Sequence, residues 1–436
     1  MFYHLFFLVF PFFAWLIVLW FGVRPLRLPR AWAIAFAVLL FLASQKFVVY
    51  AVLGGDAFKP ELPETFIHVT GWAYSSFMLF VGLVCTAAIV KGLAWFFLKR
   101  QLQNLQRHRR FHRNRPTCFA KIGTILVGRH RRCRRFNEVL QLPLNPRQRE
   151  AIRATQGIRR RQFVAGLAAA ATAGWGVWEG IRVPRIKRTE IEVEGLPRAF
   201  DGFRIVHLSD LHCSAAARRE HMKGIVAQAN TLNADIVCIT GDFVDGSVEA
   251  RREDLEPLKD LKSRLGVFGC AGNHEYYSGY RTWRPVFEEL GISMLDNDHH
   301  VFVRGEARLV LGGIPDETAC SPRYAGDSVT PDVVRAFEGA PEGCRILMKH
   351  RPIHLSEHER HGVRLQLSGH THGGACRGMD LLVAKMGNED HLRGLYREER
   401  IALYVNPGTG QWAGFPLRLG VPAEVSELIL RTPKAK

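Results

Sequence analysis

Residues that commonly bind metal ions follow directly after five short apolar segments in the second half of the chain. The segments are FRIVHLS (203–209), DIVCIT (235–240), GVFGCAG (266–272), RILMK (345–349) and LQLS (365–368). The polar residues that follow them are Asp210, His212, Asp242, Asn273, His274, His350, His370 and His372. Carboxylate, imidazole and amide ligands together suit borderline divalent ions such as Mn, Fe, Zn or Co, whereas calcium prefers oxygen ligands alone. The residue types therefore predict a site for such borderline ions.

The surrounding elements predict how these residues meet. The five apolar segments have the composition of strands, and EIEVEG at 190–195 alternates as a strand does. Helix-like segments lie between several of them, at 219–232, 252–264 and 331–339. Strands that alternate with helices indicate an α/β sheet covered on both faces. Sites in such sheets lie at the carboxyl ends of the strands, so we expect all five clusters to converge on one crevice.

Local geometry gives further expectations for this crevice. An extended D-x-H or H-x-H step directs its two side chains to the same side. A glycine precedes each of Asp242, Asn273 and His370, which allows a close backbone approach and a tight turn. Asp245 could orient a metal ligand through a hydrogen bond, or it could simply form a turn.

Taken one at a time, the motifs have ordinary structural explanations. The D-x-H step at 210–212 could be a turn carboxylate and a surface histidine, and Asp242 could form an Asx turn. Asn273 could cap a helix that has Glu275 in its first turn. The order of the motifs, their placement after strands and their spacing together favour one metal centre.

The motif order D-x-H, G-D-x-x-D, G-N-H-E, H and G-H-T-H resembles the calcineurin-like metallophosphoesterase superfamily, from about Thr189 to Arg431. VSELILR and the LYVNPGTG-W-GFPLRLG block are similar to membrane-associated bacterial phosphodiesterases of the YaeI/YkuE type. Where that group usually has a Ser-Arg-Gly-like turn, this chain has Asn406-Pro407-Gly408. The resemblance implies an α/β fold, a four-layered αββα sandwich, with a binuclear metal centre.

The resemblance also implies a role for each motif residue. One divalent ion would be held by Asp210, His212, Asp242 and His372. The other would be held by Asp242, Asn273, His350 and His370, with Asp242 bridging the two. His274 would stabilise the transition state or protonate the leaving oxygen, which suits an imidazole near neutral pH. Two such ions can generate a hydroxide and clamp the attacking and leaving oxygens during in-line displacement at phosphorus.

The sequence therefore predicts a hydrolase that cleaves phosphodiester or pyrophosphate bonds, with lipid-linked phosphates as plausible substrates. We find no G-x-S-x-G, Walker loop or H-E-x-x-H motif that would compete with this interpretation. The alternative is a membrane scaffold whose basic segment recruits a protein or anionic lipid while the phosphoesterase domain is idle. That alternative predicts the loss of one or more metal ligands, and none of the expected ligands is missing.

The first part of the chain has a different character. Three apolar stretches, Phe2 to Val23, Ala31 to Leu53 and Val69 to Leu98, each reach the roughly 20 residues that a membrane-spanning helix needs. We expect three transmembrane helices within 1–98, although buried core helices are an alternative. A fourth, weaker run extends from Gln162 to about Ile181 and predicts a further crossing at 162–181.

The charges next to these runs predict their orientation. The link RPLRLPR and the basic segment 99–161 carry most of the positive charge, whereas the link GGDAFKPELPET is mainly acidic. Because Lys and Arg stay on the cytoplasmic side, the basic links should lie inside and the acidic link outside. The phosphoesterase domain, at 189–431, would then lie on the periplasmic or extracytoplasmic face of a bacterial inner membrane.

The fourth run leaves other interpretations open. Arg159, Arg160 and Arg161 precede it, as in a twin-arginine export signal, and Ala171-Thr172-Ala173 resembles a cleavage site. An Ala-rich helix that lies on the membrane or packs in the soluble domain is a further alternative. Its position after three other spans favours a retained anchor.

Composition narrows the function classes further. The formal net charge is +18, yet few aromatic residues accompany the basic segment, so a nucleic-acid partner is not favoured. The nine cysteines form no C-x-x-C pair and indicate neither a zinc knuckle nor a disulfide framework. The expected partners are a phosphate-ester substrate and the bilayer, and the sequence gives no oligomeric state.

Overall fold

The computed structural model describes residues 2–26, 28–111, 146–324, 326, 329–385 and 387–433. The chain divides into two compact units. One comprises Met1–Val9, Leu42–Ser76 and Ala170–Lys436, and the other comprises Phe10–Phe41 and Phe77–Ala169. The first unit contains all of the predicted metal ligands, together with a short N-terminal segment, 42–76.

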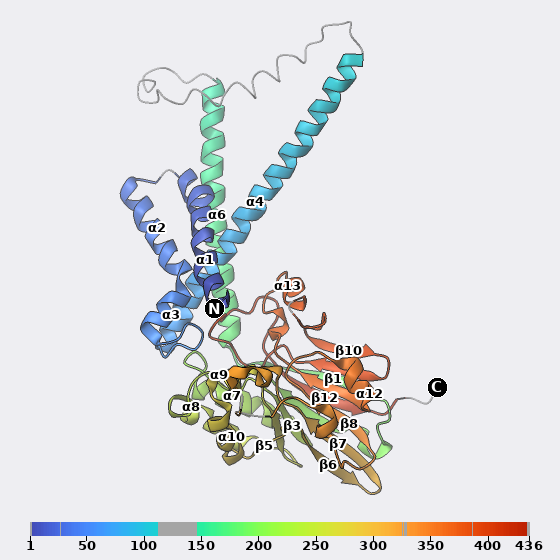
Figure 1. Ribbon diagram of the computed structural model, residues 1–436. Coiled ribbons are helices and arrows are strands. Elements are labelled where there is room, and N and C mark those ends of the chain that lie inside the picture. The colour runs from blue at the N-terminus through green and yellow to red at the C-terminus, as the bar shows by residue number, and fades with distance from the viewer. Residues whose placement is uncertain are drawn as a thin grey trace. The chain divides into compact units, whose positions relative to one another are not determined.

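The first unit contains two six-stranded sheets (Figure 1). The first sheet has the order β1-β12-β2-β3-β4-β5, in which β12 and β2 are antiparallel and the other neighbours are parallel. Its strands are β1 (Arg185–Glu192), β2 (Arg204–Leu208), β3 (Ile236–Thr240), β4 (Val267–Cys270), β5 (Ile292–Met294) and β12 (Glu424–Arg431).

The second sheet has the order β10-β11-β9-β8-β7-β6, with antiparallel pairs at its two edges. Its strands are β6 (Asp298–Arg304), β7 (Ala307–Gly313), β8 (Cys344–Met348), β9 (Val363–Ser368), β10 (Gly394–Glu398) and β11 (Ile401–Val405). The strands predicted at 203–209, 235–240, 266–272, 345–349 and 365–368 therefore correspond to β2, β3, β4, β8 and β9.

The two sheets pack face to face. Side chains of both sheets, such as Ile205 and Ile236 from the first and Ile346 and Leu365 from the second, form one buried cluster between them. Each sheet also has an apolar outer face that packs against helices. The buried apolar strands thus have both faces covered, as expected for parallel sheets, and the predicted mixed α/β fold is confirmed.

Helices cover the outer faces. α7 (Arg219–Asn230) buries Met222, Ile225, Val226 and Ala229, whose spacing places them on one side of the helix. The helices that pack on the first sheet are α7, α8 (Val248–Leu255), α9 (Asn273–Ser278) and α10 (Tyr280–Glu289). The second sheet carries α11 (Val333–Ala336) and α12 (Leu355–Arg360), and α13 (Asp380–Ala384) follows β9 along the chain. Short 3₁₀ helices lie at Arg198–Phe200, Glu256–Asp260, Glu317–Cys320, Pro322–Tyr324 and His372–Gly374.

The apolar stretches near the N-terminus are helical. They form α1 (Phe2–Ile17) with a π-helical turn at Val18–Val23, α2 (Arg30–Ser44), α3 (Lys46–Gly54) and α4 (Glu64–Phe111), and a 3₁₀ turn lies at Arg24–Leu26. Within the described part of the chain, one helical segment, Glu64–Val90, is long and apolar enough to cross a membrane. α2 and α3 are bent by 67° relative to one another. They would make a second such segment if the bent pair is counted as one span.

The fourth predicted crossing lies in α6 (Pro146–Ile181), which is not among the helices that meet this test. Four transmembrane helices are therefore not confirmed, and the crossing at 162–181 stays a prediction. The basic segment 99–161 extends through residues 112–145, which lie outside the described residues. The predicted boundaries 1–98, 99–161, 162–181 and 189–431 also remain predictions.

Candidate metal centre

The predicted ligands converge at the carboxyl ends of the strands. β2 leads to Asp210 and His212, β3 to Asp242, β4 to Asn273 at the start of α9, β8 to His350, and β9 to His370 and His372. Among the described residues, three groups could hold a metal ion, and the ligand atoms of each lie within 4.8 Å of one another. The groups are Asp210–His212–His372, His212–Asp242–His274 and Asp242–His350–His370.

The backbone at these residues is not extended. Positive φ angles occur at Asp210 (52°), His212 (44°), Asp242 (54°), His370 (69°) and His372 (47°). The expectation of extended D-x-H and H-x-H steps was therefore wrong. A left-handed conformation costs a residue other than glycine about 1–3 kcal/mol and is typical of functional sites, so the surrounding contacts must hold these loops in place.

Close backbone approach explains the glycines that precede the ligands. A Cβ atom at Gly272 would lie 2.3 Å from Oδ1 of Asp242, and one at Gly369 would lie 2.3 Å from Oδ2 of Asp210. Any side chain at either position would displace a predicted ligand. The expected need for glycine beside Asn273 and His370 is confirmed.

In the first ligand group, two imidazole rings face one another. Nε2 of His212 lies 3.0 Å from Nε2 of His372, and the latter lies 3.5 Å from Oδ1 of Asp210. Asp210 also accepts the backbone N–H of His370, at 3.1 and 3.0 Å from its two oxygens. Two imidazole nitrogens and one carboxylate oxygen thus point at a common position.

In the other group, Asp242 faces a second pair of imidazoles. Its Oδ2 lies 3.2 Å from Nε2 of His350, which lies 3.2 Å from Nδ1 of His370. Nδ1 of His350 donates to the carbonyl oxygen of Thr240 at 2.7 Å, which leaves Nε2 directed at Asp242. The same Asp242 oxygen is 3.6 Å from Nε2 of His212, so this carboxylate lies between the two groups.

The electrostatics of the site favour a cation between the carboxylates and imidazoles. Burial would lower the pKa of His350, but the facing Asp242 carboxylate outweighs burial and raises it to about 10. Burial raises the pKa of the Asp210 carboxyl. For Asp242, His350 and the other nearby histidines overcome the effect of burial and hold its pKa well below the usual range. His370 is different, because burial and the neighbouring His350 lower its pKa to about 3.

Asn273 shows that the residues present fit a metal ion. Its side chain is buried, and Oδ1 has no hydrogen-bond partner among the residues that the structure describes. A buried amide oxygen without a partner is costly, and such an oxygen is a suitable ligand for a divalent ion. Together with the carboxylates and imidazoles, Asn273 completes a mixed nitrogen and oxygen ligand set of the kind that borderline divalent ions prefer.

Asp245 joins a predicted ligand to the predicted acid. Nδ1 of His212 donates to Oδ2 of Asp245 at 3.0 Å, and Nδ1 of His274 donates to Oδ1. The backbone N–H of His274 also donates to Oδ1 of Asp242 at 2.9 Å. Burial alone would lower the pKa of His274, but the Asp245 and Asp242 carboxylates raise it to about 9. Of its two predicted roles, Asp245 therefore takes the orienting one.

Glu275 has a structural role that sequence reasoning missed. Its buried carboxylate accepts the backbone N–H groups of Asp242 at 2.8 Å, Phe243 at 2.7 Å and Gly272 at 2.7 Å. It therefore ties the loop after β3 to the start of α9. The signal in the sequence was the G-N-H-E motif itself, which predicted only a residue in the first helical turn.

Arg418 is a second residue that sequence reasoning missed. It is buried, and it donates to the carbonyl oxygens of Pro407 and Gly410, at 2.5 Å and 2.8 Å. Its Nη2 lies 3.3 Å from Nδ1 of His372. The Asn-Pro-Gly turn at 406–408 thus forms the wall beside His372, and Arg418 holds that wall. Arg418 lies in the GFPLRLG block, but the sequence of that block does not indicate the role of its arginine.

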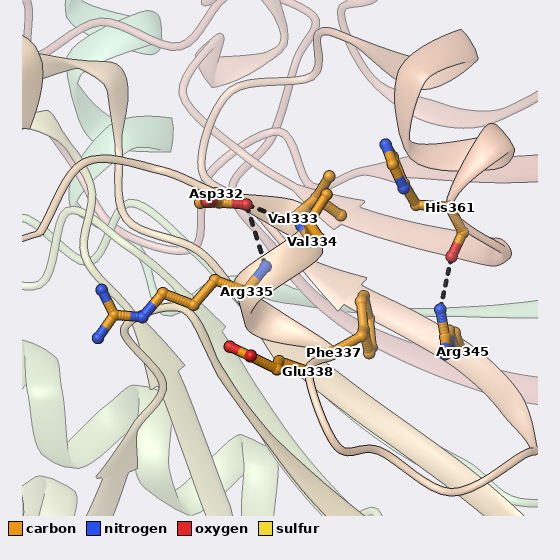
Figure 2. A pocket seen from close by; sticks show the side chains of 8 residues that line it. All are labelled: Asp332, Val333, Val334, Arg335, Phe337, Glu338, Arg345 and His361. Carbon is orange, nitrogen blue, oxygen red and sulfur yellow. Dashed lines mark hydrogen bonds between the residues drawn. The ribbon is translucent and has the colours of Figure 1, made fainter.

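A separate pocket lies away from the metal centre. Figure 2 shows Asp332, Val333 and Arg335 near α11, with Arg345 and His361 opposite them. None of the predicted ligands lines this open hollow of about 470 Å³. Its size alone does not associate it with the chemistry predicted at the strand ends.

Comparisons with known proteins agree with this geometry. The calcineurin-like phosphoesterase family model matches residues 203–374. A Danio rerio protein named transmembrane protein with metallophosphoesterase domain is 35% identical over 283 residues, which cover 63% of this chain and 64% of that protein. A Helicobacter pylori metallophosphoesterase is 35% identical over 58% of this chain and 66% of its own length. The Bacillus subtilis metallophosphoesterase YkuE is 27% identical over 63% of this chain and 98% of its own.

The chain spans less than two thirds of the length of the first two of these relatives. The residues matched by the family model, 203–374, include all of the predicted ligands. All three relatives are named for a metallophosphoesterase or its domain. The chain therefore carries a calcineurin-like metallophosphoesterase domain.

Proposed function

We propose that the protein is a membrane-anchored, metal-dependent phosphoesterase that hydrolyses phosphodiester or pyrophosphate bonds. One observation carries this proposal: the predicted carboxylate and imidazole ligands meet at one end of the two sheets, and within the described part of the chain the buried Oδ1 of Asn273 lacks a partner. An idle domain would be expected to lack part of this set. The scaffold hypothesis is therefore the weaker one.

Two divalent ions, drawn from Mn, Fe, Zn and Co, fit the ligand set. Asp210, His212 and His372 would hold one, and Asn273, His350 and His370 would hold the other. Asp242 would contact both, since its Oδ2 lies within 3.6 Å of Nε2 of both His212 and His350. Such ions supply Lewis-acid polarisation of phosphoryl oxygens and activation of water.

The residues of the chain would supply positioning and a proton. His274 keeps its proton at neutral pH because the Asp245 and Asp242 carboxylates raise its pKa. Asp245 accepts from Nδ1 of His274 and so directs Nε2 away from itself. We propose that Nε2 donates this proton to the leaving oxygen of the ester. The same carboxylate fixes the ring of His212, so one residue aligns the acid with a ligand.

Membrane anchoring is the second part of the proposal. It is supported by the apolar Glu64–Val90 segment, by the charge pattern of the links and by the name of the Danio rerio relative. The domain would lie on the extracytoplasmic face of a bacterial inner membrane, held by several crossings. A site tethered in this way would meet lipid-linked phosphates, which we propose as a substrate class.

The activity is tested with the full-length, Mn-loaded protein and bis(p-nitrophenyl) phosphate. Asp242→Asn and His274→Ala should each abolish most turnover, because the first removes a shared charge and the second removes the proton donor. Asp298→Asn and His361→Ala change the same residue types away from the site, and both variants should retain turnover. Turnover that survives both site substitutions would refute the assignment.

The topology has its own test. A reporter that is active only in the cytoplasm is fused after Lys436, and a periplasm-active reporter is fused at the same point. We expect signal from the second fusion alone. Signal from the first would place the domain inside the cell and overturn the proposed orientation without affecting the proposed chemistry.

A further inference from the structure

We propose that Phe58 and Trp412 form an aromatic wall beside His274 that binds an apolar group of the substrate. This inference rests on the proposed phosphoesterase function and adds a specificity determinant to the same site. It also makes the segment before α4 part of the active site, although the sequence predicts only a short extracytoplasmic link there.

Trp412 lies next to the predicted acid. Its ring centroid is 6.0 Å from that of His274, with the rings nearly perpendicular at 80°, and its side chain is partly exposed. A Cβ atom at Gly414 would lie 2.3 Å from the indole ring, so the ring packs directly on this backbone. The turn that carries Trp412 is therefore shaped to hold an aromatic side chain at the edge of the site.

A buried lysine fixes this turn from the N-terminal segment. Nζ of Lys46 donates to the carbonyl oxygens of Ala413 and Gly414, at 3.2 and 2.9 Å. The side chain of Lys46 is almost fully buried, and burying an ammonium group is costly unless it is hydrogen-bonded. These two contacts therefore hold the Trp412 turn in one position.

Phe58 extends the wall from the same N-terminal segment. Its ring stacks on Trp412, with centroids 6.1 Å apart and planes inclined by 10°. Oδ1 of Asp56 accepts the backbone N–H groups of Phe58 and Lys59, at 2.8 and 3.0 Å. Such an Asx-type turn fixes the local backbone, so the orientation of Phe58 is built into the loop.

The loop is also attached to the helix that carries His274. Nζ of Lys59 donates to the carbonyl oxygen of Tyr277 at 2.7 Å, and the ring of Tyr277 lies 5.2 Å from that of His274. Glu61 forms an ion pair with the buried Arg251 of α8. The segment therefore contacts α8, α9 and the Trp412 turn, and a merely passive tether would not require all three.

The chemistry of the wall identifies what it binds. A phosphoryl group would be recognised by the ligands and by His274. Partly exposed aromatic rings favour contact with another ring or an alkyl chain, through apolar burial and offset stacking. We therefore assign the wall to an apolar group esterified to the phosphate of the substrate, whether it is aromatic or aliphatic.

Three phosphonates test this assignment on the full-length, Mn-loaded protein. Phenylphosphonate, octylphosphonate and methylphosphonate carry the same anionic group and differ in the apolar substituent. Inhibition constants against bis(p-nitrophenyl) phosphate are measured for the native protein, for Trp412→Ala, Phe58→Ala and Gly414→Ala, and for two controls. Trp412→Phe keeps an aromatic ring in the wall, and Val303→Ala removes an exposed apolar side chain on β6.

We expect the native protein to prefer phenyl- or octylphosphonate over methylphosphonate, by about 5- to 10-fold. Trp412→Ala and Gly414→Ala should remove this preference, Phe58→Ala should reduce it, and both controls should keep most of it. Preference for phenylphosphonate indicates a ring as the natural group, and preference for octylphosphonate indicates a chain.

The outcomes separate this inference from the proposed function. If no phosphonate inhibits and no diester is turned over, the phosphoesterase function itself is wrong. If all three bind equally to the native protein, or if Trp412→Ala weakens all three by the same factor, the function stands and the aromatic wall is refuted. Unfolding midpoints of the variants identify a general loss of structure. A variant that unfolds early is replaced by one that keeps more apolar volume without a ring, Trp412→Leu or Phe58→Leu.

Discussion

The two sheets supply different halves of the metal centre. The loops after β2 and β3 of the first sheet provide the carboxylates Asp210 and Asp242, whereas the loops after β8 and β9 of the second provide only imidazoles as predicted ligands. Two of the three ligand groups, Asp210–His212–His372 and Asp242–His350–His370, therefore combine residues of both sheets. The centre depends on the face-to-face packing of the two sheets.

The groups that face each histidine also affect its pKa. His350 faces Asp242 across the gap between the sheets, and its pKa is raised to about 10. The neighbouring His370 has a pKa lowered to about 3, because burial and His350 dominate there. A carboxylate that directly faces an imidazole, as Asp242 faces His350, can thus outweigh the effect of burial on its pKa.

The largest expected effect compares one ligand from each sheet. Asp210→Asn removes a negative charge, and His370→Ala removes one neutral nitrogen. We expect Mn affinity to fall by at least about 100-fold in the first variant and by about 10-fold in the second, since the charge contributes more strongly in a buried site. Calorimetric titration of the full-length protein measures both values.

Controls for this comparison are Asp298→Asn and His361→Ala, which should bind Mn as the native protein does. Equal losses in the Asp210 and His370 variants would show that the two sheets contribute alike, against the division of charge described above.

The next largest effect concerns the loops of the first sheet alone. Glu275→Gln replaces a carboxylate that accepts four backbone N–H groups by an amide whose NH₂ group cannot accept them. Buried donors without a partner cost about 1–3 kcal/mol each, so we expect the free energy of unfolding to fall by about 3 kcal/mol. Urea denaturation measures the change.

The control Glu338→Gln, on the exposed surface after α11, should leave the free energy of unfolding nearly unchanged. A Glu275→Gln variant as stable as the native protein would mean that the Asp242 loop is held by other contacts.

Much of this arrangement could be predicted from the sequence. The strands were recognisable as apolar runs, and the ligands as polar residues immediately after them, because a buried parallel strand must be apolar and must end where its site begins. Gly272 and Gly369 were predictable for the same reason, since both allow the backbone to approach a carboxylate.

The features that could not be predicted from the sequence depend on contacts between residues that are distant in the chain. The left-handed φ angles of Asp210 and His372 contradict local preference, and only the assembled loops impose them. Arg418 holds the wall beside His372 through backbone carbonyl groups, which carry no sequence signature. The docking of Phe58 on Trp412 joins residues more than 350 positions apart, and hydropathy alone predicted only a link between two apolar runs.

A smaller effect tests how the first sheet orients its own histidines. Asp245→Asn removes the charge that fixes His212 and His274, and we expect kcat to fall about 10- to 30-fold. The carboxylate raises the pKa of His274, so its loss lowers that pKa. Because His274 must be protonated to act as an acid, the basic limb of the pH profile of kcat should move to lower pH.

Asp260→Asn changes an exposed carboxylate after α8 and should leave the profile in place. If the Asp245 variant is slower but its basic limb does not move, His274 is not the proton donor, and Asp245 serves only to position His212.

The smallest expected effect concerns a buried histidine on α12, the helix that packs on the second sheet. His358, on α12, is buried and donates through Nδ1 to Oε1 of Gln366 at 2.7 Å, and burial lowers its pKa to about 4. Below its ordinary pKa of about 6.5, the unfolded chain binds a proton that the folded protein does not, so stability falls as the pH drops toward 4.

His358→Gln lacks this proton uptake. It should therefore lose about 1 kcal/mol less stability than the native protein between pH 7 and 5.5, as measured by urea unfolding at both values. His361→Gln, three residues further along the chain, serves as the control. Equal pH dependence in the native protein and in His358→Gln would show that burial does not keep this imidazole neutral.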